Sequence, residues 1–413
     1  MQYPTISEYV KANQDASDNL DMSTKATEEE RKEAFVDEWG VKYRKDGRKL
    51  LKAPYGLNGT YSIKEGVRII CDEAFLNCSS LTGIVIPSSV TSIGERAFYG
   101  CSSLGNIVIP EGVTSIRIGT FLGCRSLKEV AIPSSVTSIG DWVFKGCRSL
   151  RSIVIPDGVT SIGNIAFTDC SSFLIKYISI PKNVICLNGN PFAKWDGKLE
   201  CLSPNFIYED NVLFNKDKSK IISFRNQAIR SYIIPSSVTS IGDSAFRGCS
   251  SLTDIVIPDS VTCIGDDAFS GCRSLRSVVI PNSVTSIGNW AFKDCCSLTG
   301  IVIPDGVTSI GYGAFYFCES LTNIAIPDGV TSIGNWEFEG CNSLTNIVIP
   351  DSVTSIGERA FYGCSSLRNI AIPDSVTCIG EFTFFGCNFP YKLKLELASR
   401  FGEGIFDQLF FIP

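Results

Sequence analysis

The segment Leu81–Ser103 reads LTGIVIPSSVTSIGERAFYGCSS, and close copies of it fill much of the chain. Its proline returns every 23 residues from Pro87 to Pro156 and again from Pro235 to Pro373. Its cysteine keeps the same interval from Cys78 to Cys170 and from Cys249 to Cys387, and a phenylalanine lies three residues before each of these cysteines. A fixed period of this length predicts a solenoid, in which each unit buries its apolar face against its neighbours.

Each unit divides into a strand, a second extended segment and a tight turn. The segment Leu81–Ile86 ends in period-2 alternation, so its Leu and two Ile face inward, and Pro87 ends the strand because it has no N–H to donate. The β-branched residues of Val90–Ile93 favour a second extended segment, after which Gly94 is expected to allow a positive φ. We expect Ala97–Cys101 to form one helical turn with its Phe and Cys on the same face. Stacked rungs place equivalent residues about 4.8 Å apart, so that each position becomes a column.

The pattern LxxIxIPxxVTSIGxxAFxGCxSL, as in Leu252–Leu275 and Leu344–Leu367, resembles the leucine-rich repeat with its LxxLxL strand. It is most similar to the BspA-type subclass, found in bacterial surface proteins and some parasitic protists, and the resemblance covers about residues 54–390. The predicted fold class is therefore a leucine-rich-repeat solenoid of 23-residue rungs. It would consist mainly of short parallel β-strands with single helical turns, broken by one β-hairpin insertion.

A second repeat, with an offset of 171 residues, divides the chain. Val41–Leu51 aligns with Val212–Ile222, and each segment has strand patterns around a polar turn, which predicts a β-hairpin. We therefore expect five parts. They are an acidic helical N-terminal segment (1–40), a first hairpin and array (41–186), an irregular insertion with the second hairpin (187–231), a second array (232–387) and a C-terminal helical cap (388–413).

Both ends of the chain are predicted to cap the stack. Thr5–Glu8 and Thr27–Glu30 fit the capping-box pattern and predict short helices over about 6–14 and 28–38. At the other end Tyr391–Phe401 predicts a helix that covers the last rung. An apolar tail follows it, with Phe406, Leu409, Phe410 and Phe411.

The composition excludes several classes of function. The chain has 413 residues and a formal charge of −6, and residues 1–40 account for all of it with ten acidic and four basic side chains. A nucleic-acid partner is not expected, because binding to phosphates needs a basic face. The chain has no His, which removes the commonest general base and the commonest metal ligand. We therefore expect no cofactor, no metal and no enzyme that depends on imidazole.

The sequence shows no targeting or membrane segment. Met1–Ser23 is polar and acidic, unlike a secretory signal, and no 18 apolar residues run together as a transmembrane helix requires. As written, the chain is expected to start in the cytosol, whereas the resemblance implies a cell-surface or secreted location.

The 18 cysteines suggest disulfides, a metal site or a catalytic thiol. In a column the Cβ atoms stay about 4.8 Å apart, whereas a disulfide needs about 3.8 Å. Four thiolates in a line do not converge on one metal ion, and a catalytic thiol would lack a base. We favour a structural role, in which small buried side chains fill one column of the core.

The strongest candidate binding surface is the outward face of the first strand of each rung, expected to be concave. Between the two Ile the outward residue is Val or Ala, and two positions earlier it is small or polar. A long exposed apolar stripe often marks an interaction surface, although Val is also simply a good strand former. The candidate protein-binding residues are Asn106, Val108, Glu129, Asp254, Val256, Val279, Val302, Asn323, Asn346, Val348 and Asn369.

Three tryptophans, Trp142, Trp290 and Trp336, share one register two residues before the Phe column. Exposed Trp is a favoured binding anchor. Because these three lie rungs apart, we favour partial burial between turns.

Together these features predict a non-enzymatic, monomeric protein-binding solenoid. The resemblance implies a surface adhesion or host-interaction protein whose partner is a host extracellular-matrix or surface protein, since relatives bind such proteins. The alternative is an intracellular interaction scaffold, which the missing signal and the unpaired cysteines favour. An enzyme ranks third, because no constellation of catalytic groups is present.

Overall fold

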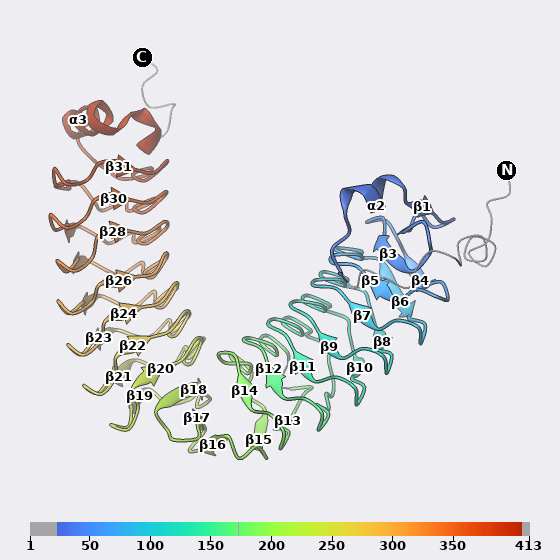
Figure 1. The fold of residues 1–413 in the computed structure, drawn as a ribbon. Coiled ribbons are helices and arrows are strands. Elements are labelled where there is room, and N and C mark those ends of the chain that lie inside the picture. The colour runs from blue at the N-terminus through green and yellow to red at the C-terminus, as the bar shows by residue number, and fades with distance from the viewer. Residues whose placement is uncertain (1–22, 172, 407–413) are drawn as a thin grey trace. The chain divides into compact units, whose positions relative to one another are not determined.

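The computed structural model describes residues 23–171 and 173–406, in which successive rungs stack as a β-solenoid with mostly parallel strands and little helix (Figure 1). The chain divides into two compact units, Met1–Phe206 and Ile207–Pro413. A typical rung contributes a long strand from its LxxIxI segment and a short strand from its VTSIG segment. The long strands and the short strands form separate parallel ladders.

In the first unit the long strands form a four-stranded parallel sheet. It contains β4 (Gly59–Ser62), β6 (Leu81–Val85), β8 (Asn106–Val108) and β10 (Glu129–Ala131). The antiparallel strands β1 (Phe35–Val36), β2 (Lys42–Tyr43) and β3 (Lys49–Lys52) lead into the short strands β5 (Ile69–Ile70) and β7 (Ser92–Ile93). The short strands continue in a second ladder of β9 (Ser115–Ile116), β11 (Ser138–Ile139), β12 (Ser161–Ile162) and β14 (Cys186–Leu187). Strands β13 (Tyr177–Ile180) and β15 (Lys198–Cys201) pair with each other.

In the second unit the long strands form a six-stranded parallel sheet. It contains β19 (Ser231–Ile233), β21 (Asp254–Val256), β23 (Ser277–Val279), β25 (Gly300–Val302), β27 (Asn323–Ala325) and β29 (Asn346–Val348). The short strands follow β16 (Phe206–Glu209) and the antiparallel pair β17 (Val212–Asn215) and β18 (Lys220–Phe224). They are β20 (Ser240–Ile241), β22 (Cys263–Ile264), β24 (Ser286–Ile287) and β26 (Ser309–Ile310), and then β28 (Ser332–Ile333), β30 (Ser355–Ile356) and β31 (Cys378–Ile379).

A column of stacked phenylalanines runs through the core of each unit. From Phe75 to Phe192 the ring centroids of successive rungs lie 5.2–5.9 Å apart. From Phe246 to Phe384 they lie 5.1–5.8 Å apart. Each aromatic pair adds about 0.5–1.5 kcal/mol to the stabilisation that burial already gives.

The segment that carries the Phe and the Cys is not helical, so the prediction of a single helical turn is wrong. The N–H groups of Arg96, Phe98 and Gly100 donate to carbonyls of the next rung at 2.8–2.9 Å. Those of Tyr99 and Cys101 donate three residues back within their own rung. The backbone is left-handed at Arg96 (φ 52°) and Gly100 (φ 71°). These consecutive turns therefore form a third ladder between rungs, which an α-helical turn could not supply.

The glycine of the VTSIG segment has a different role from the one predicted. Gly94 does not adopt a positive φ, but a Cβ at this position would overlap the backbone N of Asp72 in the preceding rung. Close approach of two rungs therefore requires this glycine. The left-handed glycine of the same rung is Gly100.

The N-terminal cap combines a short helix with a strand. Helix α2 (Glu28–Lys32) begins with the predicted capping box, in which the Thr27 side chain and the Glu30 side chain satisfy each other's backbone N–H groups. The helix predicted to reach residue 38 ends at Lys32, because Phe35 enters β1 and stacks on Tyr43 at 5.2 Å. The helix predicted over 6–14 lies outside the described residues.

The C-terminal cap contains helix α3 (Tyr391–Phe401), as predicted, followed by the 3₁₀ turn η1 (Glu403–Ile405). The carbonyls of Gly404 and Ile405 accept the N–H groups of Phe382 and Phe384 at 2.8 and 2.9 Å and so replace a further rung. Phe406 is buried against the last rung. Leu409, Phe410 and Phe411 lie outside the described residues.

Residues 187–231, predicted as an irregular insertion, contain regular structure in both units. Phe192 extends the Phe stack of the first unit, and β15 pairs in parallel with β13. The hairpin β17–β18 then leads into the short strands of the second unit. Within the described part of the chain, no helix is long and apolar enough to cross a membrane.

Candidate binding surfaces

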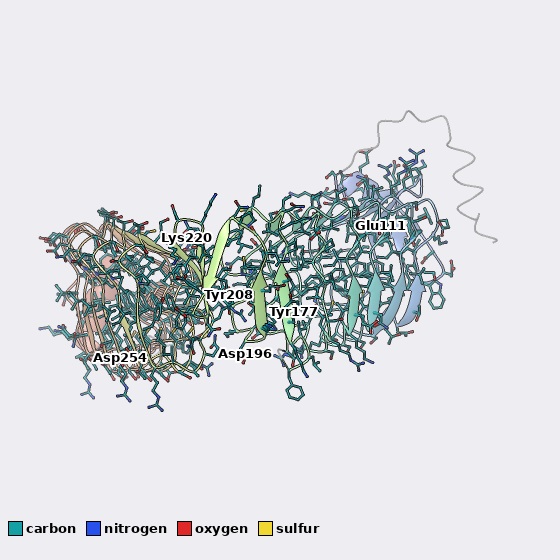
Figure 2. All side chains as sticks on the ribbon, turned by 90° about the horizontal axis from the view of Figure 1, so that it is seen from below. Glu111, Tyr177, Asp196, Tyr208, Lys220 and Asp254 are labelled. Atoms are coloured by element: carbon teal, nitrogen blue, oxygen red, sulfur yellow. The ribbon has the colours of Figure 1, made fainter. Side chains whose placement is uncertain are left out.

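All eleven predicted binding residues are exposed on the outward face of the long strands, the long-strand face. Asn106, Val108 and Glu129 lie on β8 and β10 of the first unit. The other eight lie in the second unit, where Asp254 marks the first of their strands (Figure 2). Asn369 belongs to the rung after β29, outside an assigned strand.

The structure aligns the apolar residues of the second unit into one column. Val256 pairs with Ile233 on one side and with Val279 on the other, and Val279 pairs with Val302. The side chains of Val256, Val279, Val302 and Val348 are each 54–75% exposed. The sequence therefore places an apolar stripe along a parallel sheet.

The polar groups beside the stripe include free hydrogen-bonding capacity. The hydroxyls of Thr299, Thr322 and Thr345 donate to carbonyls of the preceding rung at 3.0–3.3 Å and are thereby satisfied. The amides of Asn346 and Asn369 have no hydrogen-bond partner among the described residues, so both can bind a ligand. This combination suits a partner with apolar and amide groups.

The two tryptophans of the second unit are half-buried, as predicted, and they also contact each other. Trp290 and Trp336 lie two rungs apart, yet their rings stack with centroids 5.9 Å apart. The rung between them has Gly313 in this register, and a Cβ there would overlap the six-membered ring of Trp290. This contact was not predicted, because it depends on a side chain that is missing from the rung between the two tryptophans.

Further groups complete this aromatic cluster. Tyr316 meets the Trp290 ring edge to face at 5.3 Å. The Lys293 ammonium lies 5.3 Å from the centroid of Trp290 and 5.2 Å from that of Tyr316, within the range of cation–π attraction. Both tryptophans remain half-buried, so the cluster is mainly a packing arrangement on the turns.

The first unit has a glycine in the same register, with a different outcome. Gly119 lies between Arg96 and Trp142, and a Cβ there would meet the Arg96 side chain at 3.2 Å. An open hollow of about 530 Å³ remains beside these residues. Its walls are Glu73, Leu76, Asn77, Arg96, Tyr99, Leu122, Trp142 and Lys145.

The column cysteines are buried, and each also donates a hydrogen bond that the sequence analysis missed. The Sγ of Cys101 donates to the carbonyl of Phe75 at 3.1 Å, and that of Cys124 donates to the carbonyl of Phe98 at 3.2 Å. The same contact recurs along both units, with a longer distance of 3.9 Å at Cys249. The sequence did contain a sign of this hydrogen bond. Ala or Val would fill a similar volume, yet neither replaces Cys in any of these rungs.

Burial makes these thiols poor nucleophiles and poor metal ligands. Loss of solvation raises the pKa of Cys124, Cys170 and Cys387 to about 12. The thiolate is the reactive form of cysteine, so it is nearly absent at neutral pH. All 18 cysteines are free, and no group of three or more potential ligands converges on a metal position in the described part of the chain.

The second unit also holds a buried carboxyl group beside the aromatic cluster. Glu337 accepts a hydrogen bond from the N–H of Gly334 at 2.8 Å, and burial raises its pKa to about 8. No imidazole is present in the chain, and no thiol or hydroxyl contacts this carboxyl within the described residues. Its chemistry is that of a packed side chain.

The comparison with protein families identifies the repeat. The family model described as BspA type Leucine rich repeat region matches residues 68–200, 220–344 and 287–409. The chain therefore belongs to the BspA-type leucine-rich-repeat family. Bacterial surface-type repeats of this family imply protein binding, and the family is generally non-enzymatic. No protein in a search of curated proteins matches the chain.

Solved structures of bacterial repeat proteins share the fold. A leucine-rich repeat protein from Eubacterium ventriosum is 27% identical, with a TM-score of 0.62 over 80% of this chain and 91% of that one. A leucine rich cell surface protein from Faecalibacterium prausnitzii is 28% identical, with a TM-score of 0.52 over 76% and 94%. The pneumococcal vaccine antigen PcpA is 20% identical and shares the fold, with a TM-score of 0.56 over 90% and 97%.

The thiol column predicts a sharp difference between native and unfolded protein. Thirteen cysteines are buried, three are intermediate and two, Cys186 and Cys378, are exposed. Titration with a thiol reagent at pH 7–8 should modify the exposed pair rapidly and the intermediate three slowly. In denaturant it should modify all 18. Rapid native modification of more than these five, or far fewer than 18 thiols in denaturant, would contradict the column.

The gap at Gly313 can be tested against its counterpart Gly119, because the two have φ angles of 62° and 61°. Replacement of either by Ala introduces a similar left-handed strain of roughly 1–2 kcal/mol. Gly313→Ala must also displace Trp290, which should add about 1–3 kcal/mol of destabilisation. Denaturant midpoints and tryptophan emission measure both effects. Equal midpoints and unchanged emission in the two variants would show that Trp290 does not cover Gly313.

Proposed function

We propose that this chain is a monomeric cell-surface adhesion or host-interaction protein. It binds a host extracellular-matrix or surface protein through the long-strand face of the second unit. The observation that carries the proposal is the register-aligned stripe of exposed Ile, Val and Ala on six successive parallel strands. The residues that flank the stripe are small or polar, and Asp254 is the only charged one among the candidate residues of the second unit.

The size of this face supports a protein partner. Six strands spaced about 4.8 Å apart give a stripe of roughly 24 Å. A standard protein interface buries about 800 Å² on each side, and its centre is apolar and poor in charge. Asp254 is the only charged residue among the eight candidate residues of this unit. Burial of the exposed valines would provide the main favourable term, and the free Asn amides would provide orientation.

The surface location is supported by the relatives. The family's repeats are typical of bacterial surface proteins, and the similar protein from Faecalibacterium prausnitzii is itself described as a cell surface protein. One observation favours the alternative, an intracellular scaffold. All 18 cysteines are unbridged, and free thiols are typical of reducing compartments.

Treatment of intact source cells with protease, followed by immunodetection of the chain, distinguishes the two. A surface protein should disappear from intact cells while a cytosolic marker survives. Protection of the chain until the cells are lysed would contradict the adhesion proposal and would favour the scaffold.

Two substitutions test the binding face. Val302→Glu together with Val348→Glu places two charges in the apolar stripe without burying either, since the valines are 74% and 55% exposed. We expect thermal stability within about 0.5 kcal/mol of the parent, as for most surface changes. Adsorption to whichever of immobilised fibronectin, laminin or collagen binds the parent should weaken by about tenfold or more, since two central interface positions are lost.

The matched control adds the same charge on the short strands, at the exposed Ser309 and Ser332. Ser309→Glu with Ser332→Glu should leave the affinity unchanged. Equal loss of affinity in both double variants would mean that net charge, and not the long-strand face, governs binding. Unchanged affinity in the valine variant would move the binding site elsewhere.

A further inference from the structure

The first unit carries a concentration of positive charge that the neutral composition conceals. Six exposed cations gather beside its long strands, and we name them the basic cluster. Lys128, Arg151 and Lys176 directly follow the inward Leu or Ile of their rungs. Arg125 and Arg148 lie three residues before Lys128 and Arg151, and Lys198 is the first residue of β15. The basic cluster consists of Arg125, Lys128, Arg148, Arg151, Lys176 and Lys198.

Backbone hydrogen bonds place the basic cluster on four consecutive rungs. The N–H of Arg151 donates to the carbonyl of Lys128 at 3.0 Å, and the N–H of Lys198 donates to that of Lys176 at 2.8 Å. The rungs of Arg151 and Lys176 are adjacent, because β12 pairs with β14 in parallel and the Phe stack continues between them. Lys128, Arg151 and Lys176 occupy equivalent positions, whereas Lys198 pairs with Tyr177 and lies one position further along its strand. Each of four adjacent rungs, spaced about 4.8 Å apart, therefore carries at least one cation.

None of the six cations has a carboxylate of the described residues within ion-pair distance. Elsewhere in the same unit Lys64 and Arg96 pair with glutamates at 3.7 and 3.8 Å. Near the basic cluster, Glu200 is engaged by the hydroxyls of Tyr177 and Ser179. Like charges on neighbouring rungs repel each other, so a bound anion would relieve a repulsion that the fold itself leaves in place.

We propose that the basic cluster binds an acidic polysaccharide, with sulfate or carboxylate groups on successive sugars. A linear polyanion that lies along the stack meets a new cation on each rung. The exposed ring of Tyr177 lies on β13 within the cluster and can pack against the apolar face of a sugar (Figure 2). The exposed hydroxyl of Ser152 can bond to sugar hydroxyls.

The chemistry of this face favours a polysaccharide over a single-stranded nucleic acid. Proteins that bind single strands present several aromatic side chains on which successive bases stack. The rungs of the basic cluster present two exposed aromatic residues, Phe173 and Tyr177, and both belong to the rung of Lys176. No exposed aromatic side chain therefore repeats from rung to rung, and the hydroxyl of Tyr177 is held by Glu200. A rigid row of cations with hydroxyls between them instead matches a chain that alternates anionic groups with hydroxyls.

The second unit provides a matched control in the same register. In successive rungs of the second unit, the position after the inward Leu or Ile is occupied by Arg230, Thr253, Arg276, Thr299, Thr322, Thr345 and Arg368. At least one threonine separates each arginine from the next, so this column has no run of cations. Replacement of Arg276 and Arg368 by Glu changes the net charge by the same amount as replacement of Arg151 and Lys176.

The experiment titrates the full chain with size-defined heparin at physiological ionic strength. The parent should bind, and Arg151→Glu with Lys176→Glu should weaken binding by about tenfold or more, because ionic contacts and their released counterions are lost. Arg276→Glu with Arg368→Glu should change the affinity by less than about twofold, because neither arginine belongs to the basic cluster and the change in net charge alone is screened by salt. Circular dichroism and thermal unfolding confirm that both variants are folded.

Three outcomes would overturn the proposal. They are no heparin binding by the parent, equal weakening in the two double variants, and tighter binding of oligodeoxythymidylate or polyglutamate than of heparin. The last outcome would identify a nucleic acid or an acidic protein segment as the ligand. The result does not depend on the apolar stripe of the second unit, so each proposal can fail without the other.

Discussion

Hydrogen bonding from each rung to the next is the constraint on which the rest of the structure depends. The long strands, the short strands and the consecutive turns each form a ladder, so the backbone of one rung is satisfied by its neighbours. Residues 23 positions apart are then held in register, and every position becomes a column. The Phe rings stack and the Cys thiols reach carbonyls of the preceding rung because of this register. At the C-terminal end, Gly404 and Ile405 provide the carbonyls that a further rung would have supplied.

The ladders could be predicted from the sequence because Pro, Phe and Cys mark three points of each rung at one interval. The turn could not, because a spacing of three residues between Phe98 and Cys101 fits a helical turn and consecutive β-turns equally well. In the consecutive β-turns, alternate N–H groups donate to carbonyls of the next rung, whereas a helical turn would keep these hydrogen bonds within its own rung. The choice therefore depends on a tertiary contact. The end of α2 was missed for a similar reason. Phe35 leaves the helix to pair with β2 and stack on Tyr43, and both are tertiary contacts.

The exposed residues of the long strands were predicted correctly because alternation decides which side chains face outward. The contact of Trp290 with Trp336 was not, since it depends on a side chain that is absent from the rung between them. The thiol donors were missed because volume alone was considered for the Cys column. The basic cluster was missed because charges were counted along the chain, where acidic residues elsewhere balance them. A count of charges at equivalent positions of successive rungs would have revealed the basic cluster.

A columnar fold separates the chemistry of a surface from the stability of its core, because each outward column can change while the inward columns stay fixed. In the second unit threonines separate the arginines of the outward column, whereas the first unit gathers six cations without carboxylate partners among the described residues. Like charges on neighbouring rungs repel each other. Threonine fills the same register in the second unit without such repulsion, so the fold does not require the cations. The basic cluster is therefore a feature of the surface that the core does not need, and this supports the proposal that it serves to bind a polyanion.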